Sequence, residues 1–165
     1  KGQRPYALYG TDISKFAIKA AAKRDKAVGW AVASSYNLPI LPRSVHFALN
    51  MMAPFSAPEI RSVLRENGRF LIVSPGPEHL FSLRQQIYEN PQKHPLPDEE
   101  LPGFDFCHRQ RVQFHRHLQN EAIQSLFVMT PYSWNAPLAV REQIMSLPEL
   151  GITVDFVLTL FQKAN

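Results

Sequence analysis

Short apolar stretches alternate with helix-like segments along the chain, and this order most constrains the fold. Strand patterns are expected at Tyr6–Gly10, Val28–Ser34 and Val45–Asn50, and Ser14 is placed to cap a helix that follows the first strand. Alternation of this kind favours a mainly parallel sheet covered by helices. The 165 residues are enough for one domain with a sizeable core. We therefore predict an α/β fold with one domain over residues 1–165.

The second half of the chain continues this pattern and closes on a strand. The further elements expected are a helix capped by Ser56, a turn at Asn67–Gly68, a strand at Arg69–Val73, a helix at Pro77–Tyr88, a proline-rich acidic loop at Asn90–Gly103, a strand at Phe104–Phe114, a helix capped by Asn120 and a helix at Pro137–Ser146. The stretch ITVDFVLTLFQ (152–162) alternates with period two and predicts a final strand. It is expected to be antiparallel to the rest of the sheet.

Composition describes an ordinary globular protein. The chain is 45% hydrophobic and 19% charged, and it contains no apolar run long enough to span a membrane and no signal-peptide pattern. Cys107 is the only cysteine, which excludes an intramolecular disulfide and a cysteine-rich zinc site. These features predict a cytoplasmic protein without a membrane partner.

Positive charge is concentrated in two places. The first thirty residues hold seven basic side chains against two acids: Lys1, Arg4, Lys15, Lys19, Lys23, Arg24 and Lys26 against Asp12 and Asp25. A second cluster mixes arginine with histidine: His108, Arg109, Arg111, His115, Arg116 and His117. Each cluster is either a solvated face or a contact for RNA phosphates. The histidine spacing matches no usual zinc pattern, so we predict no metal site.

The segment ALYGTDISKFAIKAAAKR (7–24) places an acid between a strand and a helix. Many nucleotide-binding α/β units present a carboxylate to a ribose in this way, after a glycine-rich loop. Here only eleven residues precede Asp12, and the seven glycines contain no G-x-G. The acid is present without the loop that normally precedes it.

Four stretches resemble one family in order and spacing: YGTDISKFAIKAAAKR, VASSYNLPI, SPGPEHL and MTPYSW. They are similar to segments of bacterial large-subunit (23S) ribosomal RNA (guanine-N1) methyltransferases of the RlmA/RrmA type. The resemblance covers nearly the whole chain, and SPGPEHL and MTPYSW are its specific parts. It implies a Rossmann-like class I methyltransferase fold, S-adenosylmethionine as cofactor and ribosomal RNA as partner.

The same resemblance accounts for the absent glycine loop. Members of this family carry a cysteine-rich zinc-binding region and a glycine-rich strand and loop ahead of the acid, and this chain has neither. It is expected to be the C-terminal part of such an enzyme, missing the first strand of the sheet. That strand lies in the middle of the class I sheet, so its loss leaves two edges unpaired. We expect self-association, as a homodimer or otherwise, or rearrangement.

The resemblance also implies a cofactor site. Asp12 would accept from the ribose hydroxyls, Ile13 would pack on the adenine, and Ser34 and Ser35 would read the adenine edge. Each has a simpler interpretation, in which Asp12 caps a helix and the serines form a turn. From the residues alone both interpretations stay open.

The same resemblance implies catalytic residues and residues that contact the RNA substrate. Asn50, in NMMAP, follows the third strand beside the expected site of methyl transfer. His79, in SPGPEHL, is either a general base or an ordinary surface histidine. NMMAP departs from the pattern of related enzymes. RNA contacts are assigned to an aromatic pair and a basic pair, Tyr132 with Trp134 and Arg109 with Arg111. The aromatic pair either stacks on an unpaired base or anchors a proline-bent core segment.

The function predicted is S-adenosylmethionine-dependent methylation of a guanine (N1) in 23S ribosomal RNA, with this chain inactive alone. Two alternatives remain open at this level. A small-molecule class I methyltransferase would show no salt-sensitive RNA binding, whereas a non-catalytic RNA-binding module would bind RNA without the cofactor.

Overall fold

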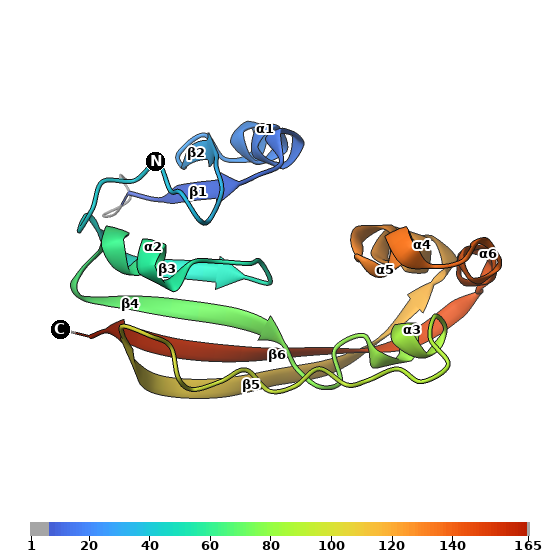
Figure 1. The fold of residues 1–165 in the computed structure, drawn as a ribbon. Helices are drawn as coiled ribbons and strands as arrows, with labels where there is room; N and C mark the ends of the chain where they lie inside the picture. The colour runs from blue at the N-terminus through green and yellow to red at the C-terminus, as the bar shows by residue number, and fades with distance from the viewer. Residues whose placement is uncertain (1–6, 165) are drawn as a thin grey trace. The chain divides into compact units, whose positions relative to one another are not determined.

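The computed structural model describes residues 7–164 as an α/β chain with six strands and six helices (Figure 1). Residues 1–6 and 165 lie outside this description, so Tyr6 of the first predicted strand and Lys1 and Arg4 of the basic cluster are not described. None of the helices within 7–164 is long and apolar enough to cross a bilayer.

The predicted order of elements is confirmed except for one short helix at Tyr132–Asn135, which was not predicted. The strands are β1 (Tyr9–Asp12), β2 (Gly29–Val32), β3 (Val45–Met51), β4 (Leu64–Pro75), β5 (Phe104–Gln119) and β6 (Glu149–Lys163). The helices are α1 (Lys15–Arg24), α2 (Ala57–Val63), α3 (Phe81–Gln85), α4 (Asn120–Met129), α5 (Tyr132–Asn135) and α6 (Leu138–Ser146). Two of the predicted caps are confirmed, because Ser14 accepts from the amide of Ala17 at 3.2 Å and Ser56 accepts from that of Glu59 at 3.4 Å.

The strands form two separate sheets. β1 and β2 pair in parallel, from Tyr9 opposite Gly29 to Asp12 opposite Val32. The other sheet has the order β3-β4-β6-β5, and Figure 1 draws β6 running against β4, so the antiparallel C-terminal strand is confirmed. β1 and β3 are not hydrogen-bonded neighbours. This is the arrangement expected of a class I sheet in which the strand between them is missing.

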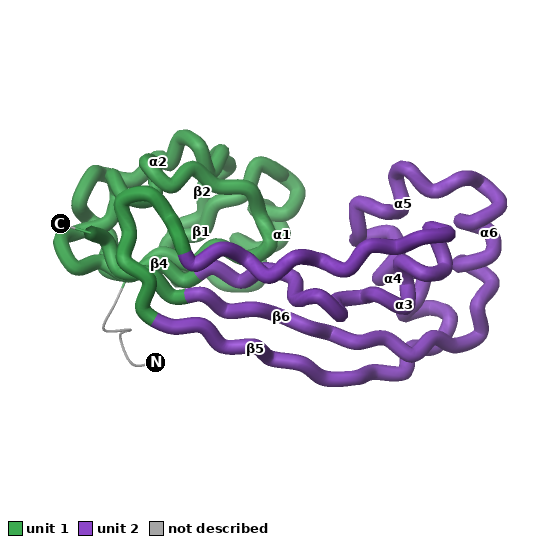
Figure 2. Tube along the Cα trace, turned by 60° about the horizontal axis from the view of Figure 1, so that its bottom comes forward, with its two compact units in different colours: residues 1–71, 100–107, 160–165 green, residues 72–99, 108–159 purple. Residues whose placement is uncertain are grey.

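The chain contacts divide the molecule into two compact units (Figure 2). Unit 1 contains residues 1–71, 100–107 and 160–165, and unit 2 contains residues 72–99 and 108–159. β4, β5 and β6 contribute to both units. The prediction of a single partial domain over the whole chain stays a prediction.

Each unit has its own core. In unit 1 the rings of Phe70 and Phe104 lie 5.7 Å apart and those of Phe104 and Phe161 lie 6.5 Å apart, so aromatic pairs fill the interior. In unit 2 the core consists of side chains from α3, α4, α6, the start of β6 and the cap residues of α3 and α5: Leu80, Leu83, Ile123, Phe127, Ala136, Ile144 and Ile152. Burial of each large apolar side chain contributes about 1.5–3 kcal/mol.

Two boundaries differ from prediction because of backbone conformation. The turn expected at Asn67–Gly68 does not precede the strand, since β4 begins at Leu64 and runs through both residues. Asn67 takes a positive φ of 57° within the strand. The helix expected over Pro77–Tyr88 is reduced to α3. Leu80 has a positive φ of 50°, and its amide donates to Thr153 on β6, so the residues before it form a turn.

The role predicted for Asn120 is wrong. Gln119 is the N-cap of α4, and Asn120 is the first helical residue. The Asn120 side-chain amide instead donates to the carbonyls of Met145 and Leu147, both at 2.8 Å. Asn120 therefore connects the start of α4 to the end of α6.

Candidate cofactor and substrate site

Asp12 stands at the carboxyl end of β1, where a parallel sheet presents its ligand-binding loops. Its side chain is exposed, and Oδ1 accepts from the amide of Ser14 at 2.7 Å. Ser14 in turn caps α1. The carboxylate therefore helps to start the helix, and it also remains at the surface, where a ribose could reach it.

The two serines predicted to read adenine lie in the turn after β2. Ser34 Oγ accepts from the amide of Tyr36 at 3.2 Å, and Ser35 Oγ donates to the carbonyl of Pro54 at 2.6 Å. Both hydroxyls thus have partners within the chain. The bond from Ser35 joins the loop after β2 to the NMMAP segment after β3.

Of the predicted cofactor residues, Asp12 and Ile13 stay accessible at the end of β1. Asp12 supplies an acceptor at a strand end, and Ile13 beside it is 77% exposed, which leaves an apolar surface for a base. Asn50, near the end of β3, is half-buried in the same unit. The side chains present fit the ribose and adenine portions of S-adenosylmethionine.

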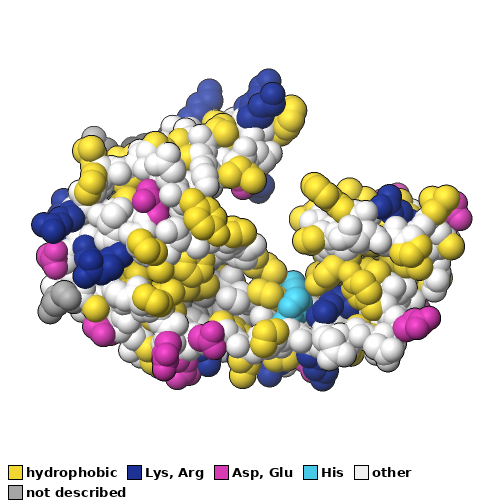
Figure 3. All heavy atoms as spheres, in the orientation of Figure 1, with side chains coloured by type: hydrophobic (Ala, Val, Ile, Leu, Met, Phe, Trp, Pro, Cys, Tyr) yellow, Lys and Arg dark blue, Asp and Glu magenta, His cyan; other side chains and the backbone are white. Residues whose placement is uncertain are grey.

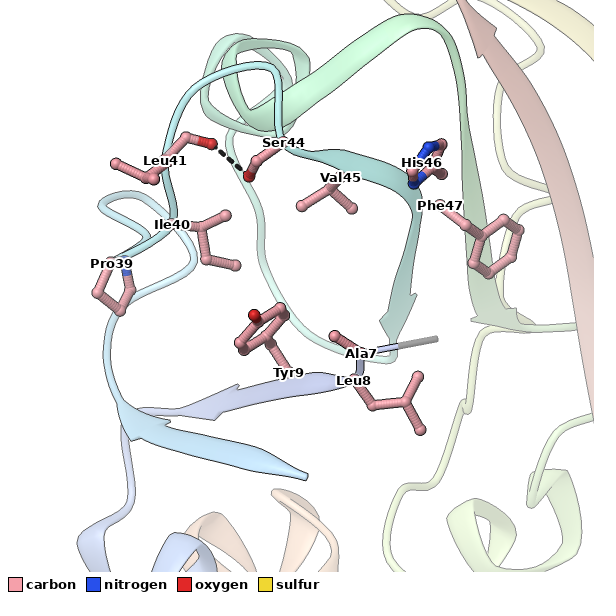
Figure 4. A pocket seen from close by; sticks show the side chains of 10 residues that line it. All are labelled: Ala7, Leu8, Tyr9, Pro39, Ile40, Leu41, Ser44, Val45, His46 and Phe47. Carbon is pink, nitrogen blue, oxygen red and sulfur yellow. Dashed lines mark hydrogen bonds between the residues drawn. The ribbon is translucent and has the colours of Figure 1, made fainter. Parts of the chain in front are cut away.

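A cavity of about 720 Å³ lies between β1 and β3 in unit 1 (Figure 4). Figure 4 shows Leu8 and Tyr9 on one wall and Val45 and Phe47 on the other, with Ile40 of the connecting loop between them. Tyr9 is 66% exposed and Phe47 is 51% exposed. The cavity is therefore an apolar space between two strand edges that do not pair.

His79 lies in unit 2, within a network centred on Asp155 of β6. The Asp155 carboxylate accepts from Arg111 at 2.8 and 2.7 Å and from the amide of Glu78 at 2.8 Å. The hydrogen bonds from Arg111 hold the pKa of Asp155 below its usual value. Sequence analysis did not identify Asp155, although an aspartate in the middle of an apolar strand is a signal for a buried partner.

His79 is itself buried. Its Nδ1 accepts from the backbone amide of Asp155 at 3.3 Å, and its ring packs 4.9 Å from that of Phe156. This hydrogen bond assigns the ring proton to Nε2. Burial, and then the nearby His94, lower the pKa of His79, so the ring is neutral at pH 7.

Both arginines predicted to contact RNA have acidic partners within the chain. Arg111 pairs with Asp155, and Arg109 pairs with Glu99 at 2.9 Å. Arg109 also donates to the carbonyl of Pro97, so it holds the acidic loop to β5. Their contact with RNA stays a prediction, and each has a structural role without it.

The two aromatic candidates have different surroundings. Tyr132 is half-buried, with the Arg84 guanidinium 5.9 Å from its ring and His94 Nε2 3.5 Å from its hydroxyl. Burial raises the pKa of Tyr132. Trp134, two residues later, is 82% exposed. The indole is therefore free to stack on a base, whereas the tyrosine ring is already packed.

No group of three or more metal-ligating side chains occurs among residues 7–164. Cys107 is exposed on β5, and the ring of His115 on the same strand bonds Thr153 at 3.0 Å.

The sequence of the chain was compared with those of characterised proteins and families. No protein-family profile matches the chain. It is 30% identical over 154 residues to the 23S rRNA (guanine(748)-N(1))-methyltransferase of Streptomyces fradiae, which covers 88% of this chain and 55% of that protein. A Bacillus subtilis (strain 168) protein, YxjB, provisionally named a 23S rRNA (guanine-N(1)-)-methyltransferase, is 28% identical over 159 residues, or 93% of this chain and 56% of its own length.

This chain is similar to the 23S rRNA (guanine-N1) methyltransferases. The resemblance expected from its motifs is thereby confirmed. The chain spans about half the length of the curated relatives it matches.

Solved structures confirm the fold class. A SAM-dependent methyltransferase from Methanosarcina mazei superposes with a TM-score of 0.52 at 14% identity, over 96% of this chain and 82% of that one. A structure from Bacillus halodurans C-125, provisionally described as a methyltransferase, gives a TM-score of 0.59 at 14% identity, over 97% and 84%. The chain has the α/β fold of class I methyltransferases.

Proposed function

We propose that this chain belongs to an enzyme that methylates N1 of a guanine in 23S ribosomal RNA with S-adenosylmethionine. The observation that carries the proposal is the similarity over 88% of the chain to the Streptomyces fradiae enzyme. An exposed acid at the end of a parallel strand, beside the exposed Ile13, supports it. Because residues 7–164 include no glycine-rich loop that faces this acid, we propose that the chain is inactive alone.

In this proposal the cofactor residues act by binding and orientation. Asp12 accepts from the ribose hydroxyls, Ile13 packs on the adenine, and Ser34 and Ser35 line its edge. When bound, S-adenosylmethionine supplies an electrophilic methyl group. The chain itself supplies alignment, and positioning of the reacting groups can provide much of the rate.

Asn50 and His79 are the proposed catalytic residues. Asn50 would hold the guanine edge by hydrogen bonding. In the tautomer described, His79 donates from Nε2, so accepting the guanine N1 proton requires its ring to release the Asp155 amide. Tyr132, Trp134, Arg109 and Arg111 are the proposed RNA residues, with the exposed Trp134 as the stacking platform.

We further propose a cytoplasmic location, where ribosomal RNA is found, and self-association through the unpaired edges of β1 and β3. Edges of this kind pair with other strands when nothing covers them.

Calorimetric titration with S-adenosylmethionine tests the cofactor proposal. The chain and a version extended upstream through a glycine-rich loop are compared, together with Asp12→Ala in the longer protein. We expect binding by the longer protein only, and a loss of at least about 10-fold in affinity for the variant, because a charge-assisted hydrogen bond is removed. Glu121→Ala, an exposed acid on α4, is the matched control.

The longer protein is then assayed for methyl transfer to 23S ribosomal RNA and to free guanosine. Transfer to RNA alone supports the proposal. Transfer to guanosine alone would support a small-molecule enzyme, and RNA binding without cofactor binding by either protein would support a non-catalytic module.

A further inference from the structure

α1 carries a row of lysines along one side. Lys15, Lys19 and Lys23 are four residues apart, and all three are exposed. Because an α-helix rises about 1.5 Å per residue, their Cα atoms are spaced at about 6 Å along the helix. We call these three residues the α1 lysine row. Figure 3 shows basic side chains projecting into solvent from this part of unit 1.

The opposite side of α1 holds the row in a fixed orientation. Ile18 and Ala21 are half-buried on the side of α1 away from the row, and α1 is in contact with β1 and β2. The side chains of alanine are small, so the helix lies close to the sheet. Packing therefore determines which face of α1 meets solvent.

No acid lies within α1 itself to balance the lysine row. The helix contains no acidic residue, and among residues 7–164 none of the three lysines forms an ion pair. Like charges four residues apart destabilise a helix by about 0.2–0.5 kcal/mol per pair. A surface that serves only solubility could intersperse both signs without this cost. An unbalanced row of positive charges of this kind favours contact with a polyanion.

An exposed aromatic side chain accompanies the row. Phe16 is 75% exposed, and the Lys15 ammonium lies 5.3 Å from the centre of its ring. Surfaces that bind single-stranded nucleic acid combine cations that follow the backbone with aromatic rings on which bases stack. The combination of Phe16 with the row favours such a ligand over a free phosphate ion.

We propose that the α1 lysine row and Phe16 form a binding surface for a single-stranded segment of RNA. The lysines contact successive phosphates, and Phe16 stacks on a base. This inference rests on the proposed function, which makes ribosomal RNA the polyanion. Ammonium groups contact phosphates without reading sequence, so the surface adds affinity and position, and target choice lies elsewhere.

Salt dependence of RNA binding tests the surface. A fluorescein-labelled single-stranded RNA is titrated with the chain by fluorescence anisotropy between 50 and 200 mM KCl. In the triple variant Lys15→Gln/Lys19→Gln/Lys23→Gln, we expect the slope of log K against log salt to fall in magnitude by about 2, or about 0.7 per lost phosphate contact. Glutamine matches lysine in helix propensity, so α1 remains folded. The corresponding triple Lys→Arg variant should keep the slope of the unsubstituted chain.

A matched control removes the same charge elsewhere in unit 1. Arg43, Arg65 and Arg69 are exposed, and their triple change to glutamine should leave the slope nearly unchanged. Phe16→Ala should weaken binding by about 5-fold or more without altering the slope, because a stacked base is lost and no phosphate contact is.

Failure of this inference is distinguishable from failure of the proposed function. If the triple Lys→Gln variant of the row and the triple Arg→Gln control change the slope equally, the effect is one of net charge and the proposed surface is wrong. An absence of RNA binding by the chain would also contradict the proposal. Preferential binding to phosphatidylglycerol vesicles would also overturn it. In each case the methyl-transfer assay on the longer protein still decides the proposed function.

Discussion

At the scale of single residues, Asp155 shows how a buried charge is retained. Asp155 is fully buried, and its carboxylate accepts hydrogen bonds from Arg111 and from the amide of Glu78. A Cβ added at Gly76 would come within 2.4 Å of that carboxyl group, so only glycine allows this approach. The network holds the SPGPEHL loop against β6, and it places His79 in the interior.

His79 makes stability depend on pH. Because its pKa is lowered in the folded chain, the unfolded chain binds more protons as pH falls below about 6.5. The stabilisation is therefore complete above that pH and is lost as pH falls toward the lowered pKa. We expect the free energy of unfolding, measured with urea, to decrease from pH 7 to pH 5, and His79→Asn to reduce this decrease, since asparagine keeps an acceptor for the Asp155 amide without titrating.

The control for this measurement is His108→Asn, an exposed histidine on β5. It should leave the pH dependence of unfolding as it is. An unchanged decrease in His79→Asn would assign the pH dependence to other groups, of which His94 is the first to examine because burial lowers its pKa as well.

At the scale of elements, capping was predictable where the cap is local. Ser14 and Ser56 bond to amides three residues further along, and both were identified from sequence. Asn120 looked like a third cap, but its partners are carbonyls at the end of α6, twenty-five and twenty-seven residues away. A short polar side chain at a helix start has the same sequence signature in both cases.

The connection from Asn120 can be removed selectively. Asn120→Ala abolishes two hydrogen bonds to carbonyls at the end of α6 and the bond that the Gln124 amide donates to Asn120 Oδ1. We expect a loss of about 1–3 kcal/mol in the free energy of unfolding, because each bond contributes about 1 kcal/mol. Urea denaturation followed by circular dichroism measures the change. Glu121→Ala, exposed on the same helix, should stay within about 0.5 kcal/mol of the unsubstituted chain. Equal free energies of unfolding for Asn120→Ala and Glu121→Ala would show that the bonds of Asn120 do not stabilise the packing of α4 on α6.

At the scale of the whole molecule, the separation of the two sheets is the main departure from a closed α/β domain. β1 and β3 present edges to the same cavity, and the side chains of Leu8, Tyr9 and Phe47 there are exposed. Open apolar edges are sites of association in natural proteins.

We expect the chain to self-associate through these edges. Sedimentation velocity at increasing protein concentration should show species larger than a monomer, and Tyr9→Lys with Phe47→Lys should shift the distribution toward the monomer, because lysine blocks edge pairing. Lysines at exposed positions on α6, in Leu138→Lys with Met145→Lys, are the matched control. A monomer at all concentrations would exclude association through the edges.

The sequence by itself determined the order of elements apart from α5, two helix caps, the acid at the end of β1 and the family resemblance. These depend on neighbours within a few residues, where periodicity and capping act. Only the tertiary structure decided that Arg111 pairs with Asp155, 44 residues away, and that Tyr132 is packed while Trp134 is exposed. Charge partners and burial are set by which elements meet in space, and residues far apart in sequence carry no local sign of that meeting.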